Sequence, residues 1–202
     1  MSTAPNIGVL ALQGGVREHL AALEQAGVTA QPVASLADLR QVQGLIVPGG
    51  ESTTMSKLAI HDGLLEPLRE ARAAGMPMYG SCAGMIMLAD RVTDARPDQE
   101  FISGLNITVR RNAFGRQLDS FEIDLDFKSM AGGALRAVFI RAPWVEEVGE
   151  GVDVLATITT GPRAGTIVAV QQGPLLATSF HPELTGDARV HAIFVEIVRQ
   201  YA

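Results

Sequence analysis

The chain has 202 residues, of which 47% are hydrophobic and 19% charged, and its formal net charge at pH 7 is −6. This length suits one domain, residues 1–202, with a sizeable core, and the composition excludes a disordered chain. No basic cluster indicates nucleic acid as a partner, and no apolar run is long enough for a signal peptide or a membrane span. The single cysteine excludes an internal disulfide and is compatible with the cytoplasm, where we expect the protein to be.

The first half of the chain alternates strand and helix patterns. Short apolar runs predict buried strands at residues 7–12, 45–47 and 76–79. Apolar spacing and end signals predict helices over residues 16–26, from 52 onward, over 64–74 and over 85–89. This alternation predicts a parallel sheet with helices on both faces.

The second half is richer in strand patterns. Residues 121–127 alternate strictly between apolar and acidic side chains, which predicts a strand with one wet face in antiparallel pairing. Further strands are predicted at 107–109, 137–140, 154–158, 166–170 and 175–180, and a closing helix carries an apolar face from 190 to 201. The predicted fold class is therefore α/β, with a mixed, largely parallel sheet, helices on both faces and additional antiparallel strands.

The only cysteine, Cys82, lies at a predicted strand-to-helix turn between Gly80 and Gly84. A nucleophile at such a turn projects from the sheet, and the start of the following helix favours a thiolate. A buried structural cysteine is the alternative, because free cysteines are often buried. This segment alone does not separate the two interpretations.

Two other predicted strands end in distinctive residues. Gly49 and Gly50 follow the strand at 45–47, while His181 and Glu183 follow the last strand. Because the carboxyl ends of parallel strands meet at one edge of a sheet, these residues can lie near the cysteine. On a continued extended segment the histidine and the glutamate would share a side, so the carboxylate can orient the imidazole while the other ring nitrogen faces the thiol.

Simpler interpretations stay open at this point. A lone histidine at a strand end is more often structural than catalytic, a Gly-Gly pair is most often a plain turn, and Glu183 can be an ordinary surface carboxylate. The remaining histidines, His19, His61 and His191, fall on predicted helices and are most simply surface or satisfied residues. Because ligand spacing and a phosphate-binding loop are missing, we expect no metal and no cofactor.

Blocks of sequence along most of the chain resemble a known family. The Gly-x-Cys-x-Gly turn and the distant His-Pro-Glu are similar to class I, triad-type glutamine amidotransferases. Within that group the chain resembles the glutaminase subunits of pyridoxal 5′-phosphate synthase. The blocks are residues 8–14 with 17–19, 48–54, 111–117, 139–143 and 179–185. The Glu-Ser-Thr-Thr, Arg-Asn-Ala-Phe-Gly-Arg-Gln and Phe-Ile-Arg-Ala-Pro sequences within them are the most specific.

This resemblance implies a flavodoxin-like amidotransferase fold over residues 1–202 and a glutaminase activity that forms glutamate and ammonia. It implies that Cys82 attacks the side-chain amide and forms a thioester, that His181 acts as base and acid, and that Glu183 orients the histidine. Backbone N–H groups of Gly50, in the turn it forms with Gly49, and of Ala83 would hold the oxyanion.

The resemblance also implies where the substrate binds. The family's glutamine-binding positions fall on Gly49, Gly50, Glu51, Arg111, Ile140 and Arg141. Either arginine suits the α-carboxylate and Glu51 suits the α-ammonium group. We also expect Gln13, beside the first turn, to couple partner docking to the oxyanion hole.

The implied partner is a (β/α)₈-barrel synthase that receives the ammonia, in a large hetero-oligomer decorated by glutaminases. One alternative is the glutaminase of another synthase, such as imidazole glycerol phosphate synthase, which shares the triad and should lack the block at 111–117. The other alternative is a non-catalytic regulatory module of the same fold.

Overall fold

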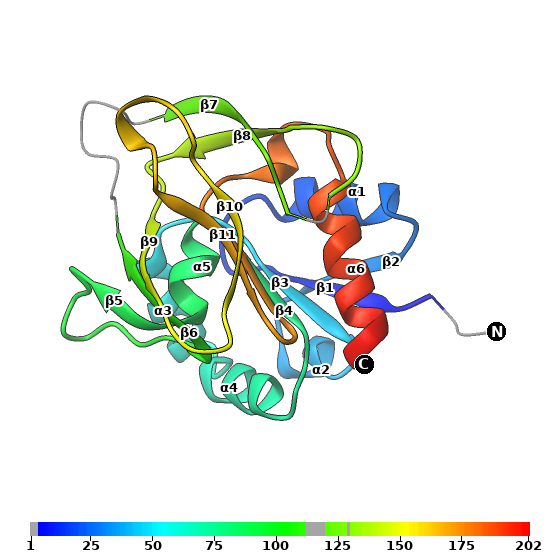
Figure 1. The fold of residues 1–202 in the computed structure, drawn as a ribbon. Coiled ribbons are helices and arrows are strands. Elements are labelled where there is room, and N and C mark those ends of the chain that lie inside the picture. Colours follow the sequence, from blue (N-terminus) through cyan, green and yellow to red (C-terminus); the bar gives the residue numbers. More distant parts are fainter. Residues whose placement is uncertain (1–3, 112–119, 129) are drawn as a thin grey trace.

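Four strands from the first half of the chain and one from near its end form the parallel part of the main sheet. The computed structural model describes residues 4–111, 120–128 and 130–202. Five neighbouring strands of its main sheet are parallel, in the order β2 (Thr29–Val33), β1 (Asn6–Leu10), β3 (Gly44–Val47), β4 (Met78–Ser81) and β12 (Leu175–Thr178) (Figure 1). This order is that of flavodoxin-like sheets, in which ligands bind beyond the carboxyl ends of the strands.

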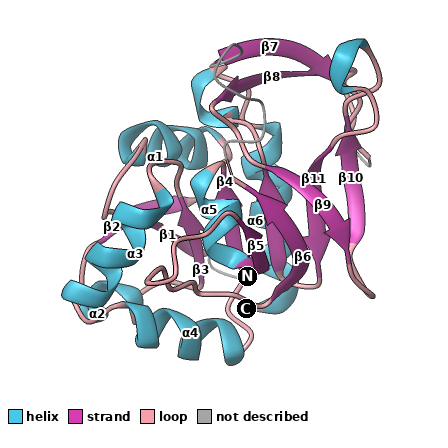
Figure 2. Ribbon diagram, turned by 90° about the vertical axis from the view of Figure 1, so that its left-hand side faces the viewer, coloured by secondary structure: helices cyan, strands magenta, loops and turns pink. Residues whose placement is uncertain are grey.

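The main sheet continues beyond β12 with strands of mixed direction. They are, in order, the antiparallel β11 (Ile167–Gln172) and β9 (Trp144–Val148), then β6 (Leu105–Arg110) and β5 (Ala89–Thr93), with β10 (Asp153–Thr157) paired beside β11. A separate antiparallel hairpin is formed by β7 (Ser120–Leu125) and β8 (Leu135–Ile140). The hairpin lies above the main sheet in Figures 1 and 2.

Side chains of the parallel strands alternate between two apolar clusters, one on each face of the sheet. Ile46 and Tyr79 face one cluster, whereas Val47 and Met78 face the other. Because both faces are covered, these strands are apolar at nearly every position, which is why short continuous apolar runs predicted them.

Helices cover both faces of the sheet (Figure 2). The first cluster contains residues of α1 (Val16–Gln25) and α6 (Arg189–Tyr201). The opposite cluster contains residues of α2 (Leu36–Leu39), α3 (Ser52–His61), α4 (Leu65–Ala73) and α5 (Ala83–Leu88). Two 3₁₀ turns, η1 (Gly161–Arg163) and η2 (Pro182–Leu184), complete the described elements. None of the helices in these residues is long and apolar enough to cross a bilayer.

The predicted α/β class is confirmed, including the antiparallel pairing of the acidic strand at 121–127, which is β7. Three strands, β2, β5 and β9, had no sequence prediction. The first two lie at the edges of the sheet, and β2 contains Pro32, which an edge strand tolerates. The third carries exposed glutamates, so its apolar pattern is weak.

Closure of the α6 face depends on Phe194, which is fully buried against Tyr79 of β4. We predict that Phe194→Ala lowers the free energy of unfolding by about 3–5 kcal/mol, because it leaves a cavity under the central strand. Tyr201→Ala, on the exposed end of the same helix, should cost less than about 1 kcal/mol. Urea unfolding of both variants checks this, and equal losses would contradict the packing described.

Candidate active site

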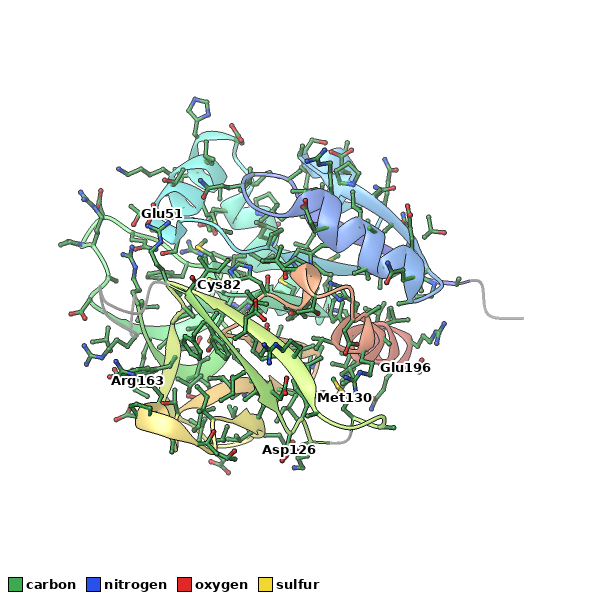
Figure 3. All side chains as sticks on the ribbon, turned by 90° about the horizontal axis from the view of Figure 1, so that it is seen from above. Glu51, Cys82, Asp126, Met130, Arg163 and Glu196 are labelled. Atoms are coloured by element: carbon green, nitrogen blue, oxygen red, sulfur yellow. The ribbon has the colours of Figure 1, made fainter. Side chains whose placement is uncertain are left out.

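The carboxyl ends of three parallel strands lie level with one another. Gly80 of β4 is paired with Val47 of β3 and with Ala177 of β12. The chain beyond these ends forms a pocket of about 430 Å³. Eight of the predicted site residues line it: Gly50, Glu51, Cys82, Ala83, Arg111, Ile140, Arg141 and His181. Figure 3 shows Cys82 near the middle of the molecule and Glu51 further out.

Cys82 forms a strained turn between β4 and α5. Its backbone has φ 51° and ψ −108°, a conformation that costs a non-glycine residue roughly 1–3 kcal/mol. The flanking glycines make the turn feasible, because a Cβ on Gly84 would lie 1.9 Å from the Val47 carbonyl oxygen and one on Gly80 would lie 2.4 Å from the backbone of Gly84. The thiol is therefore held at the pocket floor, only 6% exposed and 3.9 Å from the Ile140 carbonyl oxygen.

His181 and Glu183 meet as predicted, although by a different backbone route. We expected an extended segment, but the chain turns into η2 directly after His181. The turn still brings Nδ1 of His181 to 2.7 Å from Oε1 of Glu183, so Nδ1–H donates and Nε2 is left for the thiol side. The His181 backbone N–H donates to the Val138 carbonyl of β8, which fixes the position of the ring.

Electrostatics favour a charged histidine beside the thiol. Burial lowers the pKa of His181, but its hydrogen bonds to Cys82 and Glu183 and their charges outweigh burial and raise the pKa to about 10. For Glu183, burial raises the pKa, and the hydrogen bond from His181 together with the nearby His19 lowers it overall. His181 is therefore held as an imidazolium between the Cys82 sulfur and the Glu183 carboxylate.

The Gly49–Gly50 turn packs closely on this pair. A Cβ at Gly49 would lie 2.4 Å from Cε1 of the His181 ring, so only glycine fits there. Gly49 therefore contacts the triad without lining the pocket. The next peptide is anchored by Gln13, whose Oε1 accepts a hydrogen bond from the Glu51 N–H at 2.7 Å.

The two predicted arginines differ in their surroundings. Arg111 donates to Glu51 at 3.0 Å and to Gln99 at 2.8 Å, so its guanidinium is already engaged. Arg141 lines the pocket on a positive φ of 42°, and no side chain among the described residues pairs with it. Residues 112–117 of the block that begins at Arg111 lie outside the described residues.

Glu51 is the N-cap residue of α3, which begins at Ser52 as predicted. Its carboxylate accepts hydrogen bonds from the N–H groups of Thr53 and Thr54. Burial raises the pKa of Glu51, but these hydrogen bonds outweigh burial and lower it. The carboxylate is thus ionised at the pocket rim while it stabilises the helix start.

Two histidines that the sequence analysis interpreted as surface or satisfied residues lie next to the site, where His19 is 3.5 Å from Glu183. His19 and His191 are fully buried and 2.9 Å apart, whereas the side chain of His61 is 84% exposed. Gln99, which accepts a hydrogen bond from Arg111, was not predicted as a site residue, because it lies in a polar stretch without a recognisable motif. Within residues 4–111, 120–128 and 130–202, no group of three or more His, Cys, Asp or Glu side chains is arranged to hold a metal ion.

Comparisons with known proteins match nearly the whole chain. Residues 9–200 match the model of the SNO glutamine amidotransferase family. The chain is 63% identical to pyridoxal 5′-phosphate synthase subunit PdxT of Acidothermus cellulolyticus, over 100% of this chain and 97% of the relative. It is 62% identical to PdxT of Salinispora arenicola, over 98% of each. A crystal structure of a glutamine amidotransferase superposes with a TM-score of 0.87 at 45% identity, over 96% of this chain and 98% of that one.

The buried histidines should make the fold sensitive to mild acid. Burial first, and then His19, lowers the pKa of His191 to about 3, against the opposing charges of Glu183 and Asp187. Its pKa in the unfolded chain is near 6.5, so the unfolded state binds a proton that the folded state does not. Stability should therefore fall as the pH drops from 6.5 toward 3, by at most about 1.4 kcal/mol per pH unit for this group.

Urea unfolding at pH 6.5 and 5.5 checks this expectation. His191→Gln should lose less stability between the two pH values than the unchanged chain, and the exposed control His61→Gln should lose as much as the unchanged chain. The assignment is wrong if His191→Gln shows the full pH dependence.

Proposed function

Because the chain belongs to the SNO glutamine amidotransferase family, we propose that Cys82, His181 and Glu183 form the catalytic triad with which it hydrolyses glutamine. The chain is a glutaminase subunit of a pyridoxal 5′-phosphate synthase. One observation carries the triad assignment: Nδ1 of His181 is hydrogen-bonded to the buried Glu183, while His181 and Cys82 line the same pocket.

A protonated His181 in the same pocket as Cys82 supports a two-step reaction. In the first step the Cys82 thiolate bonds to the carboxamide carbon, the His181 imidazolium gives its proton to the leaving nitrogen, and ammonia departs from a thioester. In the second step neutral His181 takes a proton from water, the resulting hydroxide attacks the thioester, and glutamate leaves as the thiolate returns. Glu183 keeps the proton-carrying nitrogen aimed at the reacting atoms.

Backbone N–H groups of Gly50 and Ala83 are the proposed oxyanion hole. Both residues line the pocket on either side of the thiol, one from the turn after β3 and the other from the first position of α5. One such donor is worth roughly 3–4 kcal/mol in the transition state. The start of α5 adds a favourable dipole for negative charge.

Arg141 is the proposed partner of the substrate α-carboxylate. Its charge faces the pocket with no partner in the described part of the chain, whereas Arg111 is held by Glu51 and Gln99. Arg111 instead fixes the position of the Glu51 carboxylate, which we assign to the α-ammonium group. Gly50 and Ile140 supply further walls of the pocket, and Gly49 packs behind them on the His181 ring.

The ammonia acceptor is a synthase subunit, since the relatives are named as subunits of pyridoxal 5′-phosphate synthase. We propose that this partner is a (β/α)₈ barrel, that the two assemble into a large hetero-oligomer, and that the reaction takes place in the cytoplasm. The partner also separates the remaining alternatives, because the cyclase subunit of imidazole glycerol phosphate synthase should not stimulate this chain.

The first test measures ammonia release from glutamine with and without the purified synthase subunit. Activity should rise on addition of the synthase, and Cys82→Ala should lower it at least about a thousandfold, because no other thiol can form the thioester. Circular dichroism checks that the variant is folded. Continued ammonia release by folded Cys82→Ala in the complex would refute the assignment of the nucleophile.

The second test concerns Gln13. We predict that Gln13→Ala lowers the synthase-stimulated kcat by roughly 10–100-fold, because the Glu51 N–H loses the acceptor that sets the neighbouring oxyanion peptide. Gln43→Ala is the matched control, since Gln43 accepts from the Asn6 N–H at the opposite end of β3. Unchanged stimulated hydrolysis in Gln13→Ala would remove Gln13 from the mechanism.

A further inference from the structure

A polar cluster lies beneath the triad, on the face of the sheet covered by α1 and α6. It consists of His19 of α1, His191 of α6 and Ser81 of β4, all fully buried. Nδ1 of His19 is 2.9 Å from Nε2 of His191, and Nε2 of His19 is 3.1 Å from Oγ of Ser81. Three distant segments therefore place polar side chains in an otherwise apolar layer, where each one is costly unless it is bonded.

The cluster faces the unused oxygen of Glu183. Oε1 of Glu183 accepts from His181, whereas Oε2 is buried and has no hydrogen-bond partner in the described residues. Nε2 of His19 lies 3.5 Å from that oxygen. Because a buried carboxylate oxygen without a donor is strongly unfavourable, an N–H of His19 beside Oε2 would stabilise the position of the whole carboxylate.

The tautomers of the two histidines follow from this contact. If Nε2 of His19 carries the proton, its N–H lies between Oγ of Ser81 at 3.1 Å and Oε2 of Glu183 at 3.5 Å, and Nδ1 accepts from Nε2–H of His191. Of the four ring nitrogens of this pair, only Nδ1 of His191 is then left without a partner, as a bare lone pair. The opposite arrangement points a lone pair of His19 at the carboxylate and leaves a buried N–H of His191 without an acceptor, so electrostatics select the first.

The imidazole rings of His19 and His191 are both neutral in this arrangement. Burial lowers the pKa of His19, as it does that of His191, so neither competes with His181 for the proton used in the reaction. The cluster thus adds an oriented N–H beneath the carboxylate without adding a second acid.

We infer that His19 is a positioning residue: it holds Oε2 of the Glu183 carboxylate, so that Oε1 can orient His181. His191 in turn fixes the tautomer of His19. The inference rests on the proposed triad, because His19 reaches the reaction only through Glu183. Nothing in it requires His19 to contact the substrate.

A pair of variants separates positioning from packing. In His19→Gln the amide nitrogen can occupy the place of Nε2 and donate to Glu183, whereas in His19→Asn the shorter side chain cannot reach. We expect His19→Asn to lower the kcat of the synthase complex at least about tenfold with the KM for glutamine within about twofold, the loss typical of removing a group that orients a reacting side chain. His19→Gln should keep kcat within about threefold.

A double-mutant cycle with Glu183→Ala gives the second readout. If His19 acts through Glu183, adding His19→Asn to Glu183→Ala should change kcat less than about twofold, whereas a packing defect would lower it by the same factor in both backgrounds. His61→Asn is the matched control on the surface, and thermal unfolding confirms that each variant is folded under the assay conditions.

Three results would overturn the inference: full activity in His19→Asn, equal losses in the Asn and Gln variants, or additive losses in the cycle. Should His19→Asn fail to fold, the decision passes to His19→Gln and to His191→Asn, which removes the tautomer-fixing donor and should lower kcat only where Glu183 is present. A failure of the triad itself would appear separately, as continued activity in Glu183→Ala or Cys82→Ala.

Discussion

The pairing register of β4 with its parallel neighbours determines where every reacting group lies. Ser81 is paired with Thr178 of β12, and Gly80 is paired with Val47 of β3, so the thiol emerges one residue beyond the last pair with β12 and two beyond the last pair with β3. Side chains alternate along a strand, and a slip of one residue would exchange the two faces. The same register that presents Cys82 to the pocket therefore directs Ser81 toward the buried histidines.

That register also explains how a strained nucleophile is maintained. The backbone at Cys82 is unfavourable by itself, and it persists because α5 is buried along its whole length and packs on β3 and β4 without room to relax. Glycine at positions 80 and 84 is the condition for that close packing. The packing of the core thus holds the Cys82 sulfur in one direction, despite the strain in its backbone.

Structural features that depend on a local sequence pattern could be predicted, whereas those that depend on contacts between distant residues could not. The buried parallel strands, the elbow at Cys82 and the pairing of His181 with Glu183 follow from runs, spacings and strand ends. Edge strands such as β2 carry too little apolar pattern to be recognised. The contact of His19 with His191 joins residues 172 positions apart, and no local signal announces it. The 3₁₀ turn after His181 replaced an extended segment because Pro182 starts a tight turn there.

Having one cysteine in the whole chain has a practical consequence. Every thiol signal from this protein, whether from a dye, a mass adduct or an infrared label, originates at Cys82. No background thiols need to be removed by mutagenesis, so the native chain can be used for active-site titration. Because the sulfur is almost enclosed, its labelling rate reports how readily a reagent reaches the pocket floor, and each folded subunit carries one such probe.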